Sequence, residues 1–316
     1  MLKYFYDITI CKVRADWTES RQSSYFYDYS SGTEVYMITL TQPGLHQFEI
    51  ELFATGRRND VFDRNSDPNI DLCLVLCKVN DPTSISSGLT CIGFEHSVEY
   101  YITLSASLTP GYYLVFATSI KALSSQLLET KQQNRFSAAS DKQPQQQQQP
   151  TQSESSSSAD SPPLNHYSYN IIFHGQSTFG LNRTLLAPDI ISDIFYSVAL
   201  KMNKVKYELN GAVRSFVITG SCTHGIFIEN LSPTYCIRIQ LDISSSKNLE
   251  STRLTHVTQD YLRPNTRQLL AFLTPSNYRN GYVIGYKLDT QIFQYFANGN
   301  FPCIPSAFSG LHAVKN

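Results

Sequence analysis

A segment of low complexity divides this chain into two halves. Residues 124–163 contain glutamines from Gln145 to Gln149, a serine-rich run from Ser153 to Ser158, and the pair Pro162-Pro163. So few apolar side chains leave nothing to offset the entropy of ordering the backbone. We therefore predict a disordered Gln/Ser/Pro-rich tether over 124–163. The 316 residues, 41% of them hydrophobic, leave room for a folded domain on each side.

Both halves carry the pattern of β-strands. Short apolar or alternating blocks end at Gly, Pro, Asn or Asp, as expected for strands joined by turns. The blocks cover 35–41, 47–53, 72–79, 99–105 and 112–118 before the tether, and 167–173, 205–209, 215–219, 225–228, 235–241, 268–273 and 282–287 after it. The predicted fold class is mainly β, with two antiparallel β-sandwich-like domains. Segment 190–202 fits either a helix capped by Asp189 or a pair of strands, because its apolar residues are too dense to show a period.

Composition excludes several function classes. A formal net charge of -1 and a pI near 6.6 supply no basic surface for phosphates, so we expect no nucleic-acid partner. The first residues lack the pattern of a secretory signal, and no apolar run is long enough to span a bilayer, so we expect a cytoplasmic protein. The seven cysteines are odd in number and irregularly spaced, which favours reduced, buried thiols. The sequons at Asn182 and Asn230 are then chance matches.

Several motifs of the first half occur in an order typical of one protease family. They are the strand 35–41, the block 49–58 ending in Arg57-Arg58, the apolar strand 71–77, and the run 108–119 with its Pro-Gly-Tyr turn. In this order they resemble the β-sandwich that follows the protease core in calpains, the intracellular cysteine endopeptidases. That sandwich is C2-like, so the resemblance implies such a fold for this half.

The start of the chain narrows the resemblance to one branch. Residues 10–14, the pair Asp16-Trp17, Glu19 and Arg21 look like the junction in atypical calpains of the small-optic-lobes type. That branch has an extra C-terminal domain, which is similar to this chain at 248–253, 264–268 and 281–288. The implied domains are 1–17, the end of a protease core; 18–123, the sandwich; 124–163, the linker; 164–296, the branch-specific β domain; and 297–316, a tail.

The resemblance implies no proteolysis by this chain itself. Calpains use a cysteine nucleophile, a histidine base and an orienting asparagine that precede the sandwich, and their motifs do not occur here. We therefore expect no catalytic residues and no certain cofactor, but a noncatalytic regulatory and partner-binding part of a larger protease. Its expected partners are the protease core and protein partners or substrates. The alternative is a standalone tandem β-sandwich adaptor that binds proteins or membrane lipids.

A third function hypothesis is a hydrolase that uses Cys222 and His224. Two residues apart on a strand, these side chains share a face without an assured hydrogen bond, so a buried thiol beside a turn histidine is favoured. Cys73 and Cys77 also share a face, but about 13 Å of strand separates them, too far for one zinc ion.

An acidic loop between two predicted strands is the candidate metal site. Carboxylate and amide oxygens are the ligands that calcium prefers. Pro68 stands where an EF-hand has its glycine, and Leu74 where it has its glutamate, so an EF-hand is excluded. Weak calcium binding remains the functional hypothesis, against a plain solvated connection. The candidate ligands are Asp60, Asp63, Asn65, Asp67 and Asp71.

Two further groups are candidates for contact with other domains or proteins. Arg57 and Arg58 could pair with carboxylates of a neighbouring domain, although an exposed basic pair is the plainer interpretation. Trp17, the only tryptophan, is predicted to anchor a domain interface. Tyr25, Phe26 and Tyr27 lie in a polar, serine-containing context and are candidates for partner contact, although strand packing is the alternative.

Overall fold

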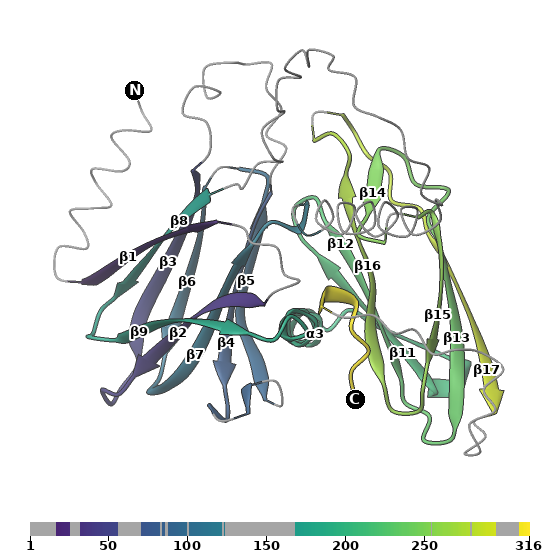
Figure 1. Ribbon diagram of the computed structural model, residues 1–316, viewed down its shortest axis with the longest axis horizontal. Coiled ribbons are helices and arrows are strands. Elements are labelled where there is room, and N and C mark those ends of the chain that lie inside the picture. The colour runs from purple at the N-terminus through teal and green to yellow at the C-terminus, as the bar shows by residue number, and fades with distance from the viewer. Residues whose placement is uncertain are drawn as a thin grey trace, which may run out of the picture.

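The described residues form two β-sandwiches, and the α-helix α3 lies between them (Figure 1). The computed structural model describes residues 17–25, 32–55, 71–123, 168–294 and 310–316, apart from 83, 86–87, 100, 122, 254 and 279. The prediction of a mainly β protein built from antiparallel sheets is confirmed. The predicted tether 124–163 and most of segment 1–17 lie outside the described residues.

The N-terminal sandwich packs a sheet of order β1-β8-β3-β6 against a sheet of order β5-β4-β7-β2-β9. Alternate residues of both sheets point inward and form one core, which includes Ile38, Ile50 and Val115. Its strands are β1 (Thr18–Tyr25), β2 (Thr33–Leu40), β3 (His46–Thr55), β4 (Leu72–Val79), β5 (Leu89–Ser97), β6 (Tyr101–Leu108), β7 (Gly111–Thr118), β8 (Ser168–Gly175) and β9 (Gly180–Leu186).

Strands β8 and β9 correct the predicted domain boundary at residue 164. β8 lies between β1 and β3 in the first sheet, with Phe173 opposite both Ser20 and Ile50. β9 forms the edge of the second sheet beside β2, with Leu181 opposite Ile38. Tyr169, Ile171 and Phe173 alternate into the core of the N-terminal sandwich. The N-terminal sandwich is therefore completed by residues from both sides of segment 124–167.

The C-terminal sandwich packs a sheet of order β10-β11-β12-β16-β14 against a sheet of order β15-β13-β17. Its core includes Ile226, Ile239 and Leu270. Its elements are β10 (Val205–Glu208), the 3-10 turn η2 (Leu209–Gly211), β11 (Val213–Thr219), β12 (His224–Asn230), β13 (Tyr235–Asp242), β14 (Leu249–Ser251), β15 (Val257–Leu262), β16 (Arg267–Pro275) and β17 (Lys287–Gln294).

Segment 282–287, predicted as a strand, is mostly irregular. Val283 makes an isolated bridge to Lys247, and regular pairing begins only at Lys287 in β17. Gly285 packs closely on Ser245, since a Cβ atom at position 285 would lie 2.7 Å from Ser245 Oγ. Tyr282 and Tyr286 are left exposed. The apolar pattern of this segment therefore indicates a packed loop.

Helix α3 (Ile190–Met202) resolves the segment that the sequence left open. The helix lies between the two sandwiches (Figure 1), and its side chains pack on Phe116 of β7 and on Phe272 of β16. Because α3 is buried on two sides, apolar residues cover most of its surface and no single apolar stripe appears. Asp189 occupies the N-cap position without a side-chain capping hydrogen bond.

Residues 310–316 include a turn that packs beside α3, between the two sandwiches. The 3-10 turn η3 (Gly310–His312) packs near α3, with Leu311 in the shared core. Gln268 Nε2 donates to the His312 carbonyl at 2.9 Å, and His312 Nδ1 donates to the Leu269 carbonyl at 2.8 Å. Part of the predicted tail 297–316 therefore belongs to the folded structure.

Candidate functional site: a buried polar junction between the sandwiches

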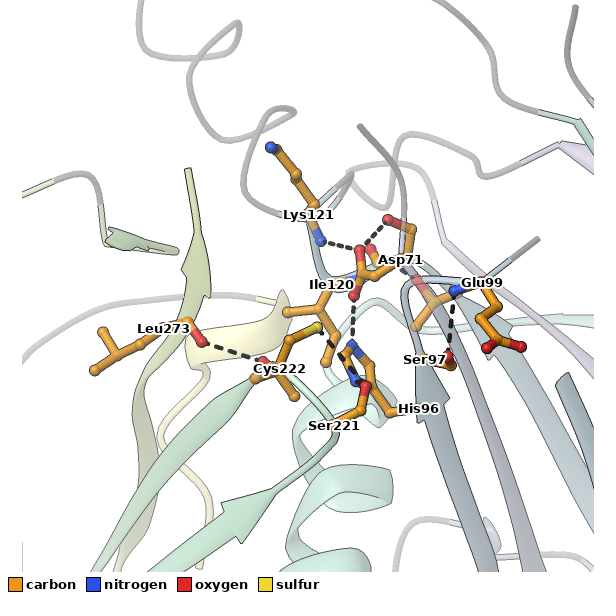
Figure 2. A network of polar contacts seen from close by, with 12 residues as sticks. Asp71, His96, Ser97, Glu99, Ile120, Lys121, Ser221, Cys222 and Leu273 are labelled. Atoms are coloured by element: carbon orange, nitrogen blue, oxygen red, sulfur yellow. Dashed lines mark hydrogen bonds and ion pairs between the residues drawn. The ribbon is translucent and has the colours of Figure 1, made fainter. Parts of the chain in front are cut away.

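The polar network of Figure 2 forms where the two sandwiches meet. Asp71 directly precedes β4, His96 lies near the end of β5, and Ser119 follows β7. Since β4 is hydrogen-bonded to both β5 and β7, these residues gather at one end of the sheet. The turn between β11 and β12 brings Ser221 and Cys222 to them from the C-terminal sandwich. We refer to this site as the polar junction.

Asp71 is the centre of the polar junction. Its Oδ1 accepts hydrogen bonds from Ser119 Oγ at 2.7 Å and from the Lys121 backbone N–H at 2.9 Å. Its Oδ2 accepts from His96 Nε2 at 2.8 Å and from the Ile120 N–H at 3.1 Å. Burial raises the pKa of this carboxyl, but the hydrogen bond and charge of His96, together with the hydrogen bonds from the Ser119 hydroxyl and the Lys121 backbone N–H, lower it below its ordinary value. Asp71 is therefore a buried carboxylate with both oxygens engaged.

His96 carries the network across to the C-terminal sandwich. Because a carboxylate only accepts, His96 Nε2 is the nitrogen that donates to Asp71, and Ser221 Oγ lies 3.3 Å from the other nitrogen, Nδ1. Gly220 packs against the imidazole, since a Cβ atom there would lie 2.7 Å from Nδ1. The close approach of the two sandwiches at this point therefore requires a residue without a side chain.

Lys121 makes a second connection between the sandwiches. Its backbone N–H holds Asp71, while its Nζ donates to the Ser276 carbonyl at 3.0 Å. The ammonium also lies 5.0 Å from the ring centroid of Tyr278, within reach of a cation–π interaction. Ser276 and Tyr278 follow β16 in the sequence, so Lys121 links the end of β7 in the N-terminal sandwich to the end of β16 in the C-terminal sandwich.

The order of Asp71, His96 and Ser221 resembles a catalytic triad, but the geometry favours a structural role. A triad histidine must exchange protons with a substrate that reaches it. The side chain of His96 has no solvent exposure, and the carboxylate of Asp71 is held by four donors that the fold already supplies. The arrangement holds the buried carboxylate of Asp71 and hydrogen-bonds its partner His96 to the second sandwich, so it stabilises the contact between the two sandwiches.

Cys222 and His224, the candidate hydrolase pair, have separate environments. Burial raises the pKa of the Cys222 thiol to about 11, although a hydrogen bond from Ser221 acts in the opposite direction. The ring of His224 lies 5.9 Å from that of Tyr286, and burial together with the charge of Lys204 lowers the pKa of this imidazole. A thiol that is protonated at neutral pH is a poor nucleophile, so the structure gives this pair no activation.

The structure places few of the other predicted site residues. Trp17 is half-buried immediately before β1, and Tyr25 is the last residue of that strand. Of the candidate calcium ligands, Asp71 alone is described, and its oxygens serve the polar junction. No cluster of three His, Cys, Asp or Glu side chains suited to a metal ion occurs among the residues that the structure describes. Phe26, Tyr27, Arg57, Arg58, Asp60, Asp63, Asn65 and Asp67 lie outside the described residues.

Single members of the polar junction could be predicted from the sequence, but their network could not. Asp71 was predicted as a metal ligand and Cys222 as a member of a hydrolase pair with His224, whereas no motif in the sequence pointed to His96 or Ser119. The residues come from four separate places in the chain, and only the packing of the two sandwiches brings them together. A single aspartate directly before the apolar run 72–77 was the signal that the sequence offered.

The comparisons bear on the C-terminal sandwich. Among the residues that the structure describes, no helix is long and apolar enough to cross a membrane. Residues 198–295 match the family of calpain-D-like C-terminal domains. The match begins in the last turn of α3 and extends through β17. The C-terminal sandwich is therefore similar to a calpain-type C-terminal domain, and the match includes the segments 248–253, 264–268 and 281–288 in which the sequence suggested one.

Proposed function

We propose that this chain is the noncatalytic regulatory and partner-binding C-terminal part of a calpain-like cysteine endopeptidase of the small-optic-lobes type, acting in the cytoplasm. The observation that carries the proposal is the match of residues 198–295 to calpain-D-like C-terminal domains. The calpain-like motifs of the first half support it. They form the strands β2, β3, β4 and β7, which make up much of the N-terminal sandwich.

The contact between the sandwiches suggests how regulation would work. A buried apolar layer around α3 and the polar junction attach the calpain-type C-terminal domain to the N-terminal sandwich. A partner bound to the C-terminal domain would therefore change the position or stability of the whole unit. In the complete protease, the N-terminal sandwich would in turn contact the protease core, with Trp17, Arg57 and Arg58 as the proposed contact residues.

A first experiment asks whether the chain has peptidase activity by itself. The purified chain is incubated with fluorescent casein and with an epoxide probe that labels cysteine proteases. We expect no cleavage and no labelling at Cys222, with papain as the positive control. Cleavage that disappears in Cys222→Ser would overturn the noncatalytic role and support a hydrolase.

A second experiment separates the proposal from the adaptor alternative. The 5′ end of the full-length transcript is sequenced, and an upstream frame that encodes a papain-like Cys/His/Asn core is the expected result. The complete protein is then assayed with wild-type Arg57-Arg58 and with both changed to alanine. Altered cleavage of casein by the double alanine variant would support contact of Arg57 and Arg58 with another domain. Lys206→Ala is the control, because this exposed side chain forms an ion pair with Glu208 in the described structure. A transcript that begins at Met1 would favour the adaptor.

Calcium binding by the acidic loop stays a prediction. Calorimetric titration of the whole chain with calcium tests it, because β8 and β9 are required to complete the N-terminal sandwich. Weak binding that is lost in Asp63→Asn and Asp67→Asn is the expected result. Equal absence of heat in all three proteins would refute the calcium hypothesis and leave the loop as a connection.

A further inference from the structure

Two cysteines lie directly opposite each other on neighbouring strands. In the antiparallel pair β4–β5, Cys77 is the register partner of Cys91, next to a β-bulge at which the register shifts. Both side chains belong to the same buried cluster and therefore point to the same face of the sheet, toward α3. Cys73, four residues earlier on β4, shares that face but lies opposite His96.

This arrangement meets the geometric requirement for a disulfide. Directly opposed residues of antiparallel strands have Cα atoms about 4.5–5.5 Å apart. Disulfides form at Cα separations of about 4.4–6.8 Å, so the register of Cys77 and Cys91 is compatible with a disulfide. Both thiols are free in the structure.

The two thiols differ in reactivity. A hydrogen bond with Cys77 lowers the pKa of Cys91, the charge of Lys201 lowers it further, and burial opposes them. The hydrogen bond with Cys91, together with complete burial, raises the pKa of Cys77. Cys91 is also the more accessible, since it is 6% exposed whereas Cys77 is fully buried. Cys91 is therefore the thiol that an oxidant meets first.

We propose that Cys77 and Cys91 are a redox-active dithiol that a hydroperoxide converts to a cross-strand disulfide. The Cys91 thiolate attacks one peroxide oxygen, the O–O bond breaks, and a sulfenic acid and hydroxide form. The Cys77 sulfur then attacks the Cys91 sulfur, the S–O bond breaks, and the hydroxyl leaves as water with the proton of Cys77. Two electrons pass from the two thiols to the peroxide, and a dithiol reductant restores them.

The disulfide would change the contact with α3. In the reduced protein Cys77 Sγ lies 3.2 Å from Ser197 Oγ of that helix. Ser197 Oγ also donates to the Ile194 carbonyl at 2.6 Å, so it keeps a partner when the contact with sulfur is lost. Because α3 packs against both sandwiches, oxidation of Cys77 and Cys91 is expected to alter the contact between the sandwiches. This inference does not depend on the proposed function.

The test maps disulfides in the whole chain. The purified protein is titrated with hydrogen peroxide, alkylated, digested without reductant and examined by mass spectrometry. We expect a linked peptide pair that contains Cys77 and Cys91 and separates on treatment with dithiothreitol. Before oxidation, iodoacetamide should label Cys91 faster than Cys73.

Two variants sharpen the result. Cys73→Ser keeps the opposed pair and should form the same linked peptide, whereas Cys91→Ser should form none. Since the wild-type mass map answers the question by itself, a folding defect in a variant does not leave the proposal open. Sulfinic acid at Cys91 without a link to Cys77, or both thiols still reduced while Cys222 is oxidised, would overturn the proposal.

Discussion

Asp71 Oδ2 and His96 Nε2 lie 2.8 Å apart, and neither side chain is exposed to solvent. Both residues belong to the N-terminal sandwich, but Ser221 of the C-terminal sandwich reaches the opposite nitrogen of the imidazole. Removing one partner of such a buried pair costs more than the pair contributes, because the other partner stays desolvated without compensation. The polar junction is therefore a place where small changes are expected to have large effects on stability.

The first prediction concerns the charge of Asp71. Asp71→Asn turns one acceptor oxygen into an NH₂ group that faces donors, so we expect a loss of about 3–5 kcal/mol in the free energy of unfolding. Urea denaturation followed by tyrosine fluorescence measures it. Asp289→Asn changes an exposed carboxylate of β17 and serves as the control. Equal stability of the two variants would contradict the role given to Asp71.

The second prediction is a pH dependence in the acid range. The pKa of Asp71 is lowered in the folded protein relative to its ordinary value of 3.8. The stabilisation is then complete above that value and is lost as the pH falls through the lower folded pKa. Unfolding free energies of wild type measured from pH 6 downward should fall more steeply below about pH 4 than those of Asp71→Asn. Parallel curves would show that Asp71 titrates normally.

The third prediction concerns Gly220. A methyl group at this position would lie 2.7 Å from His96 Nδ1 and 2.8 Å from Thr223 Cγ2. Gly220→Ala is expected to destabilise the protein by about 1–3 kcal/mol, the cost typical of overpacking. Gly281→Ala is the matched control, since no atom lies within 4 Å of its added methyl. Thermal unfolding of both variants checks the difference.

The fourth prediction concerns Phe195 of α3. Its ring makes edge-on contacts with Phe272 at 4.7 Å and with Phe116 at 6.1 Å, one in each sandwich. Phe195→Ala should cost about 3–5 kcal/mol. Calorimetry should show a single unfolding transition for wild type and its separation or broadening in the variant, since the shared layer is weakened. Two separate transitions in wild type would mean that the sandwiches unfold independently.

The fifth prediction concerns His224. Burial and the charge of Lys204 lower its pKa from the ordinary 6.5. Protonation therefore favours the unfolded chain, and wild type should lose stability as the pH falls from 6.5 toward the folded pKa. His224→Phe keeps a ring against Tyr286 and should lack this loss. Denaturation at pH 5.5 and at pH 8 compares them, and an equal pH effect in both proteins would exclude His224 as its source.

The sequence predicts strands better than it predicts domains. The segment 72–79, apolar except for Lys78, was predicted as a strand, and β4 covers the same residues because both faces of its sheet are buried. The boundary at residue 164 was wrong because pairing partners of β8 and β9 lie more than a hundred residues earlier, and alternation within a strand does not identify its neighbour. The polar junction could not be predicted for the same reason: its residues lie far apart in the sequence and come together only through tertiary packing.

The position of β8 and β9 has a practical consequence. A protease cut anywhere between residues 124 and 167 would leave one fragment with β1 to β7 and another that begins with β8. The two fragments share both sheets of the N-terminal sandwich, through the pairs β3–β8 and β2–β9. They should therefore copurify as a nicked but intact protein. Neither sandwich can be liberated from the other by breaking the chain at the place where its composition suggests a divide.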